Sequence, residues 1–374
     1  MGPRTRAHRV RRAQAGIRAQ IGTFIIAGAG MAGLSAAARV RELGATPVVY
    51  EKGTRPGGSM LVSSCVIWRF GEWDDFRAEC PDGDEVLQRL VWERLDDGIA
   101  WLESLGARVI EHDTGNPRTI GKRFDPRGLT ETLVRAAGDV RLESLDAEPT
   151  ILATGGFQGN AELVAEHIHP GGSLRLRANP WSSGDGLRYA LARGAELSAG
   201  LGEFYGRNMP DAAFSEQEFV PLAQLYGRFA RVYNERGEEF FSGEVSWSEN
   251  DLVQATAQQP GARAWYVLDD DALARRVRDR TVADVVALAP TRVDPVDLPF
   301  ATPPEARVAV RVSPGITHTI GGLRVDDRAR VVGVDGLFAA GADVGGISTG
   351  GYASGLAAAL VFGRLAAESA LHRT

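Results

Sequence analysis

The sequence is poor in cysteine, has no long apolar run and carries no excess of positive charge. Its two cysteines, Cys65 and Cys80, form no Cys-x-x-Cys pair, which argues against a disulfide framework, a redox pair or a cysteine metal cluster. The apolar runs are short and interrupted by glycine or charge, so we expect no transmembrane helix. The formal net charge of -6 gives no overall electrostatic footprint for nucleic acid. These absences favour a cytoplasmic protein without a bound metal.

Residues 1–20 differ from the rest because they contain several arginines and no acidic residue. Arg11 and Arg12 could belong to a transit peptide or a twin-arginine export signal. Against this, the apolar stretch that follows is needed as the first strand. We therefore predict a disordered basic leader over residues 1–20. The whole sequence, with 374 residues of which 44% are hydrophobic, is long enough for two domains.

Residues 24–51 are predicted to form a strand, a tight glycine turn, a helix and a second strand that ends in an acid. The turn has the pattern Gly-x-Gly-x-x-Gly in the context of a dinucleotide site. Gly28 allows the sharp turn, Gly30 lets backbone N–H groups approach a pyrophosphate, and Gly33 lets the helix pack close to the strand. The helix N-terminus offers positive partial charge to the phosphates. Glu51 would bind the adenosine ribose, and its charge disfavours NADP.

A second glycine pair follows the ribose acid. Gly57 and Gly58 can pass close beneath a dinucleotide, with the small hydroxyl of Ser59 beside it. A surface turn at residues 55–58 is the alternative interpretation. Together with the first motif, the pair resembles the FAD-binding fingerprint of flavoproteins more than that of NAD dehydrogenases.

A third glycine motif strengthens the resemblance. An apolar strand runs into Ala153-Thr154-Gly155-Gly156, which brings bare backbone to the same sheet edge as the first glycine turn. This run, with Gly184-Asp185-Gly186 before a helical pattern, resembles the FAD-dependent flavoproteins that include soluble fumarate reductase, the succinate dehydrogenase flavoprotein and the 3-ketosteroid dehydrogenases. Gly57-Gly58-Ser59 with Ser63 and Trp68 is similar to the ketosteroid branch in particular.

The resemblance implies which residues contact FAD. Asp343 would bind the ribityl hydroxyls, and the helix that follows Gly355 would direct its N-terminus at the flavin pyrimidine, stabilising negative charge on the reduced ring. The histidine that holds FAD covalently in some members falls near Gly58 and Ser59, so we expect FAD to be bound without a covalent link. The expected cofactor-binding residues are Gly28, Gly30, Met31, Ala32, Gly33, Glu51, Lys52, Gly57, Gly58, Ser59, Met60, Ser63, Ser64, Ala153, Thr154, Gly155, Gly341, Asp343, Ser354, Gly355 and Leu356.

Elsewhere, the periodicity predicts elements that pack. Residues 85–106 and 129–137 repeat apolar residues at helical spacing and predict helices. Strands expected at residues 140–142 and 151–152 bracket an unusually short connection. Relatives in the family have a longer FAD domain at this point.

We predict an α/β fold in which a Rossmann-like FAD-binding domain carries an inserted α+β capping domain. The FAD-binding domain is assigned to residues 21–204 and 306–374, and the cap to residues 205–305. The cap segment is rich in aromatic residues, and residues 234–240 resemble a segment of the family's cap. A mobile cap over a flavin would exclude water and supply specificity.

His318 and Tyr352 are the catalytic candidates, because the resemblance places their segments beside the isoalloxazine. Either residue could instead be structural: His318 could hold its loop, and Tyr352 could pack under the last helix. The substrate-binding histidine of the fumarate and succinate enzymes falls on Thr317 by ungapped alignment. Their arginines have no counterpart, since the matching positions are Tyr352 and a site near Trp247. Without that dicarboxylate clamp, fumarate reduction by the family's mechanism is not expected.

The leading hypothesis is an FAD-dependent oxidoreductase that adds or removes hydrogen across a carbon-carbon bond next to a carbonyl, as the ketosteroid branch does. It requires a hydride path to the flavin, an acid or base, and a polar group at the carbonyl. Two alternatives stay open: a flavin oxidase or dehydrogenase of another small molecule, and a degenerate protein that keeps FAD for structure or sensing. The sequence has no second dinucleotide motif and no redox cysteine pair, which argues against a pyridine-nucleotide disulfide reductase. The substrate is expected to be a small molecule, and the electron donor or acceptor is unassigned.

Overall fold

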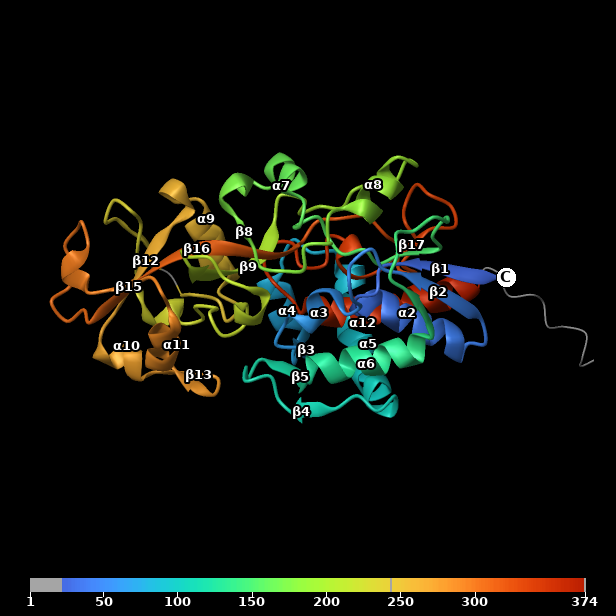
Figure 1. The fold of residues 1–374 in the computed structure, drawn as a ribbon, viewed down its shortest axis with the longest axis horizontal. Helices are drawn as coiled ribbons and strands as arrows, with labels where there is room; N and C mark the ends of the chain where they lie inside the picture. The colour runs from blue at the N-terminus through green and yellow to red at the C-terminus, as the bar shows by residue number, and fades with distance from the viewer. Residues whose placement is uncertain (1–21, 243, 373–374) are drawn as a thin grey trace, which may run out of the picture.

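The computed structural model describes residues 22–242 and 244–372, so the basic leader predicted at residues 1–20 lies outside the described residues. Figure 1 shows an elongated molecule with β1, β2 and α2 at one end and β12, β15 and α10 at the other. Among the described residues, no helix is both long enough and apolar enough to pass through a bilayer.

One end is built on a parallel sheet with the strand order β17-β7-β1-β2-β6. Ala27 pairs with both Tyr50 and Leu152, so the carboxyl ends of three strands meet at one edge. Ile26 and Val49 are fully buried, as expected for a parallel sheet covered on both faces. The strand bounds are β1 Thr23–Ala27, β2 Thr46–Tyr50, β6 Asp139–Arg141, β7 Ile151–Leu152 and β17 Phe338–Ala339. The strands predicted from the sequence around residues 24–27, 47–50 and 151–152 are confirmed.

Three helices pack side by side along this sheet: α2 (Met31–Glu42), α6 (Pro126–Ala137) and α12 (Gly355–Leu371). A Cβ on Gly363 would lie 2.4 Å from the Ala32 carbonyl oxygen, so α12 and α2 approach more closely than larger side chains allow. The predicted helix at residues 129–137 is confirmed but begins one turn earlier. Asp125 sets its start by accepting a hydrogen bond from the Gly128 N–H at 2.9 Å, as an N-cap residue does.

A small antiparallel sheet, in the order β3-β5-β4, stands beside these helices and packs on α5. One or two helices were predicted at residues 85–106, and the structure has a single helix, capped by Asp84, which accepts a hydrogen bond from the Val86 N–H at 2.9 Å. The bounds are α3 Gly58–Leu61, β3 Val66–Phe70, α4 Trp73–Glu79, α5 Glu85–Ser104, β4 Val109–Glu111 and β5 Thr119–Phe124.

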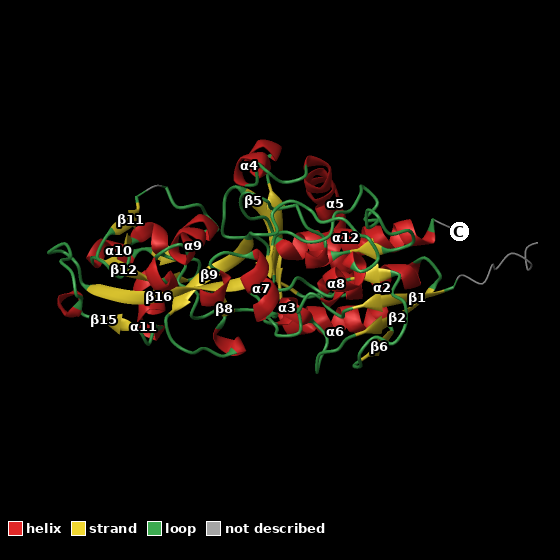
Figure 2. Cartoon of the chain, turned by 90° about the horizontal axis from the view of Figure 1, so that it is seen from above, coloured by secondary structure: helices red, strands yellow, loops and turns green. Residues whose placement is uncertain are grey.

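The other end is built around β16 (Val308–Thr319), the long strand that runs from that end towards the middle of the molecule in Figure 2. Its first half pairs with β12 and β15, and its second half with β9 and β8. The sheet therefore draws strands from outside residues 205–305, while the domain limits themselves stay a prediction. The bounds are α7 Ala161–His167, β8 Arg175–Leu176, α8 Asp185–Leu191, β9 Phe204–Pro210, β10 Arg231–Tyr233, β11 Glu239–Phe241, α9 Asn250–Ala257, β12 Ala264–Leu268, α10 Asp270–Ala274, β13 Arg276–Val277, β14 Arg280–Thr281, α11 Val282–Leu288 and β15 Arg292–Val293.

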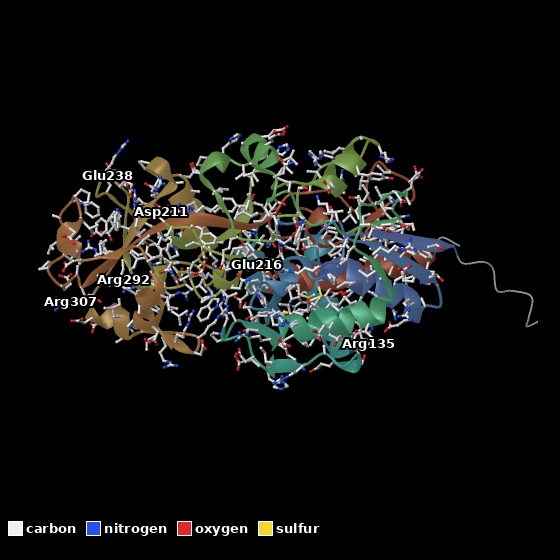
Figure 3. The ribbon with its side chains drawn as sticks, in the orientation of Figure 1. Arg135, Asp211, Glu216, Glu238, Arg292 and Arg307 are labelled. Atoms are coloured by element: carbon white, nitrogen blue, oxygen red, sulfur yellow. The ribbon has the colours of Figure 1, made fainter. Side chains whose placement is uncertain are left out.

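Polar contacts join the two ends around their boundary. Arg55 Nη2 lies 2.6 Å from Glu216 Oε2, and Glu216 stands near the middle of the molecule in Figure 3. The Ser248 hydroxyl donates a hydrogen bond to Glu79 at 3.2 Å. Exposed ion pairs contribute little stability, so these contacts position one part against the other without locking them together.

Candidate active site

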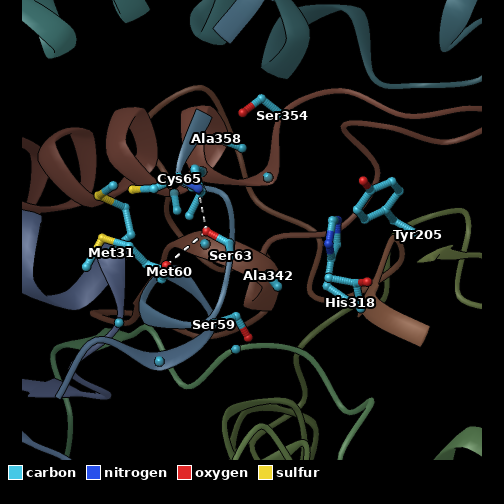
Figure 4. Close-up of a pocket in the computed structure, with 18 of the residues that line it drawn as sticks. Met31, Ser59, Met60, Ser63, Cys65, Tyr205, His318, Ala342, Ser354 and Ala358 are labelled. Carbon is cyan, nitrogen blue, oxygen red and sulfur yellow. Dashed lines mark hydrogen bonds between the residues drawn. The ribbon is translucent and has the colours of Figure 1, made fainter. Parts of the chain in front are cut away.

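A cavity of about 890 Å³ lies between the parallel sheet and the β16 sheet. One wall is formed by the glycine turn after β1 and the start of α12, and the other by β9, the end of β16 and the β13–β14 hairpin. This volume lies in the range of cofactor and small-molecule sites. Figure 4 shows Met31 and Met60 on one side of the cavity and Tyr205 and His318 on the other.

The first glycine turn forms one end of the cavity. Gly28 has a φ of +103°, in the left-handed region, and a Cβ on it would lie 2.2 Å from the Ala153 carbonyl oxygen. A Cβ on Gly30 would meet no described atom within 4 Å. Within the described residues, no side chain caps α2 and no acid stands in its first turn. The open space in front of this positive helix end fits a pyrophosphate.

The Glu51 carboxylate closes the turn from the next strand. Its two oxygens accept hydrogen bonds from the Ala29 N–H at 2.9 Å and the Gly53 N–H at 2.7 Å. Each carboxylate oxygen keeps a second lone pair. The side chain is therefore held in place and can still accept a hydrogen bond from a ribose hydroxyl.

The second glycine pair runs directly against the first turn. The Gly57 N–H donates to the Ala29 carbonyl oxygen at 2.8 Å, and a Cβ on Gly58 would lie 3.2 Å from the Gly30 Cα. Asn179 donates from Nδ2 to the Ser59 hydroxyl at 2.9 Å. The two glycine motifs therefore pack together and form one continuous wall of the cavity. Residues 57 and 58 are not an isolated surface turn.

The third motif places Thr154 at the cavity and Asp343 behind it. The Thr154 hydroxyl lies 3.0 Å from the Asp343 carboxylate, and the Gly186 N–H donates to that hydroxyl at 3.0 Å. Asp343 is 2% exposed, and this burial raises its pKa to about 7, while the hydrogen bonds from Thr154 oppose the rise. The predicted contact between Asp343 and the ribityl chain stays a prediction, because the carboxylate faces Thr154 and not the cavity.

Most residues predicted to bind the cofactor line this cavity. Three of the predicted residues, Gly33, Gly57 and Asp343, do not line the cavity and lie behind its surface. A Cβ on Gly33 would lie 1.9 Å from the Gly28 carbonyl oxygen, which is the close helix packing expected of this glycine. The predicted residues that do line the cavity are Gly28, Gly30, Met31, Ala32, Glu51, Lys52, Gly58, Ser59, Met60, Ser63, Ser64, Ala153, Thr154, Gly155, His318, Gly341, Tyr352, Ser354, Gly355 and Leu356.

At the other end of the cavity, aromatic rings gather beside the N-terminus of α12. The rings of Tyr205 and Tyr352 stack with centroids 3.5 Å apart. The His318 ring lies 5.2 Å from Tyr205 and 5.9 Å from Tyr352, and Trp68 lies 5.9 Å from Tyr352. Ser354 caps α12 by accepting a hydrogen bond from the Ala357 N–H at 3.3 Å. The two predicted catalytic residues are therefore brought together, and Tyr205 is a neighbour of both.

Burial sets the protonation states of this cluster. Burial and the neighbouring Tyr205 raise the pKa of Tyr352 well above its ordinary value, although Arg207 opposes the rise. Burial lowers the pKa of His318 to about 4. At neutral pH, Tyr352 is consequently a protonated phenol and a hydrogen-bond donor, and His318 is a neutral imidazole. The Tyr352 hydroxyl can therefore donate a hydrogen bond at neutral pH.

Cys65 is a free buried thiol near the second glycine pair. It has a φ of +53°, and its N–H donates to the Ser63 hydroxyl at 3.0 Å. Burial raises the pKa of its thiol to about 12. Because the thiolate is the reactive form, this cysteine is chemically inert at neutral pH.

Several residues that line the cavity were not singled out from the sequence. Arg177 and Asn179 line the cavity from the loop after β8, Arg207 from β9, and Arg278 from the β13–β14 hairpin. Tyr205 was noted only as one of many aromatic residues in the cap segment. None of them stands in a recognisable motif. Tyr205 and Arg207 are separated by two positions in a buried strand, which is the spacing of side chains on one face.

A family model described as an FAD binding domain matches residues 82–356, and a model described as an NAD(P)-binding Rossmann-like domain matches residues 26–64. The first match covers more than half of the chain. The predicted α/β architecture with a Rossmann-like region is thus confirmed.

Individual proteins are similar over most of the chain. A probable fumarate reductase of Shewanella frigidimarina is 25% identical over 443 aligned residues, which cover 92% of this chain and 74% of the relative. The open conformation of a flavocytochrome c3 fumarate reductase matches with a TM-score of 0.68 and 22% identity, covering 98% of this chain and 80% of that structure. A 3-ketosteroid delta1-dehydrogenase of Sterolibacterium denitrificans matches with a TM-score of 0.69 and 15% identity, covering 94% and 100%. At such identities, the structural matches establish a shared fold.

Proposed function

The chain belongs to the FAD binding domain family, and on that premise we propose that it adds hydrogen to, or removes it from, a carbon-carbon bond next to a carbonyl group. That it is an FAD-dependent oxidoreductase, as the glycine motifs predicted, is confirmed. Fumarate and the ketosteroids, which the names of its relatives carry, share a carbon-carbon bond beside a carbonyl. This shared chemistry supports the proposal, and the cavity's aromatic end supplies the residues for it.

The glycine surface is the proposed FAD site. Gly28, Gly30 and the N-terminus of α2 would hold the pyrophosphate, Glu51 the adenosine ribose, and Thr154 the ribityl side. FAD, when bound, supplies the hydride chemistry. The N-terminus of α12 at Gly355 would stabilise negative charge on the ring system. We propose a non-covalent link, because the short α3 segment carries glycine and serine where some relatives have a histidine.

The observation that carries the proposal is the stack of Tyr352 on Tyr205 beside His318. A phenol of raised pKa remains protonated at neutral pH and can donate a hydrogen bond to a substrate carbonyl or a proton to a carbon. His318 is neutral, so it is not a general acid at pH 7. We propose that Tyr352 donates the proton and that Tyr205 orients the Tyr352 ring. His318 would make a polar contact beside the reacting bond.

We also propose the class of substrate and the cellular location. The substrate is a small molecule, and the electron donor or acceptor stays unassigned. A cytoplasmic location is our proposal from the two free, buried thiols of Cys65 and Cys80, which suit a reducing compartment.

An anaerobic flavin assay tests the function. The FAD-loaded protein is reduced chemically and mixed with activated alkenes, among them an enone and an enoic acid, while the flavin absorbance is followed. Return of the oxidised flavin spectrum, with the saturated compound as product, is the expected result. Oxidation of amines or alcohols by the oxidised protein would favour the alternative dehydrogenase. A flavin that responds to none of these compounds would favour a degenerate FAD-binding protein.

A further inference from the structure

Arg207 is a buried guanidinium in the cavity wall, and no acid among the residues that the structure describes lies within ion-pair distance of it. The residue is 9% exposed, and its Nη1 makes no hydrogen bond to any described residue. Its guanidinium carbon lies 5.1 Å from the centre of the Tyr205 ring. This cation–π contact attracts the charge but leaves the N–H donors unused. A buried arginine is ordinarily paired or hydrogen-bonded, so Arg207 has donors to offer to a ligand.

Arg278 enters the same cavity from the turn of the β13–β14 hairpin. Its φ of +57° lies in the left-handed region, which residues other than glycine rarely adopt. The ladder pair of Val277 and Arg280 holds the turn in this conformation. The side chain is exposed into the cavity it lines, and within the described residues it makes neither a hydrogen bond nor an ion pair. The backbone thus presents a second unpaired guanidinium.

A third arginine, Arg177, adds positive charge to the cavity, and its hydrogen-bond acceptors carry no negative charge. Arg177 donates to the Phe219 carbonyl oxygen at 2.6 Å and to the Thr317 hydroxyl at 3.0 Å, and both acceptors are neutral. Burial lowers the pKa of Arg177 to about 10, and the nearby positive charges of Arg207 and Arg278 act in the same direction. The three guanidiniums therefore repel one another across the cavity.

Two acids act electrostatically on these arginines, Glu249 on Arg207 and Glu111 on Arg278, and each of them is paired with another arginine. Glu249 lies 3.4 Å from the Arg228 guanidinium, and Glu111 lies 2.6 Å from that of Arg123. Asp279 shares the hairpin turn with Arg278, yet no ion pair joins them among the described residues. A ligand with negative charge would satisfy the unused donors and relieve the mutual repulsion.

We propose that Arg207 and Arg278 bind a carboxylate of the substrate, with Arg177 reinforcing the positive field. The planar guanidinium forks match a carboxylate geometrically. Arg207 contacts the ring of Tyr205, which stacks on Tyr352, so the carboxylate would sit one ring away from the proton donor. This inference rests on the proposed function and narrows it: the substrate is a small unsaturated acid and not a neutral ketone.

These arginines do not belong to the pyrophosphate site. That site lies at the Gly30 end of the cavity, beside Met31 and Met60, whereas Tyr205 stands on the opposite side in Figure 4. The anion bound by Arg207 and Arg278 is therefore a second anion.

The test is a binding titration of the FAD-loaded protein with crotonate and with crotonamide, which share the alkene and the carbonyl and differ in charge. Perturbation of the oxidised flavin spectrum reports binding without turnover. We expect crotonate to bind at least about tenfold more tightly than crotonamide, because charge-assisted hydrogen bonds are about twice as strong as neutral ones. Arg207→Met and Arg278→Gln should each remove most of this preference and leave crotonamide binding nearly unchanged.

Arg276→Gln is the matched control, since Arg276 stands on the same hairpin and donates to the Asp279 carbonyl oxygen at 2.9 Å. It should bind crotonate like the wild type. If Arg207→Met fails to fold, Arg278→Gln still decides the question, because its side chain comes from an exposed turn. FAD content and melting temperature establish that each variant is folded.

Equal binding of crotonate and crotonamide, or variants that keep the preference, would overturn the proposal. Inorganic phosphate that binds more tightly than crotonate, with the same dependence on both arginines, would overturn the carboxylate assignment as well. The outcome is independent of the flavin assay for function. Crotonate can bind through the arginines while no alkene reoxidises the flavin, and in that case the proposed function fails while the carboxylate site stands.

Discussion

Tyr205 and Tyr352 lie face to face, with ring centroids 3.5 Å apart and ring planes inclined by only 9°. Tyr205 belongs to β9 of the sheet built around β16, and Tyr352 to the loop that leads into α12. The stack therefore joins the two halves of the molecule at the point where the cavity narrows to its aromatic end. It fixes the plane of the Tyr352 ring, and hence the direction in which its hydroxyl can donate.

Replacing Tyr352 by phenylalanine should abolish most turnover without loss of FAD. The ring would still stack on Tyr205, so the fold is kept, while the proton donor is gone. General acids contribute about 10²- to 10⁴-fold to rate, and we expect a loss in this range in the rate at which an activated alkene reoxidises the reduced flavin. Tyr189→Phe, at a tyrosine elsewhere on the cavity wall, is the control. A variant that keeps the wild-type rate would remove Tyr352 from the mechanism.

Two alanine substitutions in the first glycine turn should have opposite consequences. A Cβ on Gly33 would lie 1.9 Å from the Gly28 carbonyl oxygen, so Gly33→Ala should lower the melting temperature of the protein itself. A Cβ on Gly30 meets no described atom within 4 Å, so Gly30→Ala should fold normally but obstruct the pyrophosphate. Melting curves without FAD and fluorescence titration with FAD separate the two effects. Normal FAD affinity in Gly30→Ala would place the pyrophosphate elsewhere.

The glycine motifs were predictable because each is local in sequence and its conformation follows from the residue type. Gly28 takes a positive φ, and Gly30 leaves its cradle open, as the pattern requires. Arg207 and Arg278 could not be found in this way. They stand 71 positions apart by numbering, on a strand and a hairpin turn, and only the pairing of the cap strands brings them to one cavity. An unpaired buried charge is a property of the folded surroundings and leaves no local pattern.

The family's arginine positions illustrate the same limit. At the positions expected for the clamp the chain carries Tyr352 and a residue near Trp247, and this argued against a dicarboxylate. The structure supplies guanidiniums from other elements. Alignment by position compares residues that occupy the same place in the chain, whereas a ligand responds to groups that occupy the same region of space.

Removing the ribose acid should weaken FAD binding and also lower the melting temperature, because the N–H groups of Ala29 and Gly53 lose their acceptor. Glu51 accepts hydrogen bonds from two backbone N–H groups and is the proposed partner of the ribose. Loss of a charged acceptor costs about 1.5 to 3 kcal/mol, so Glu51→Ala should raise the dissociation constant of FAD roughly 10- to 100-fold. Glu131→Ala, at an exposed helix position, should leave it unchanged. Equal affinity in the two variants would show that the carboxylate does not contact the cofactor.

The pH dependence of stability should carry opposite contributions from His318 and Asp343. Burial lowers the pKa of His318 from 6.5 to about 4, so the unfolded chain binds the extra proton in this interval. The stability that His318 contributes is complete above pH 6.5 and is lost as the pH falls towards 4. Asp343 has its pKa raised from 3.8 to about 7. The folded state binds its extra proton, and the contribution is complete below pH 3.8 and is lost as the pH rises through 7.

Unfolding of the FAD-free protein in denaturant, repeated between pH 4 and pH 8, measures both contributions. The free energy of unfolding of the wild type minus that of His318→Gln should decrease as the pH falls. The same difference taken with Asp343→Asn should increase as the pH falls. Each variant serves as the control for the other. A nonspecific effect of low pH on stability would move both differences in the same direction. A difference for His318→Gln that does not vary with pH would mean that the imidazole is not held neutral by burial, and the assignment of the proton to Tyr352 alone would have to be given up.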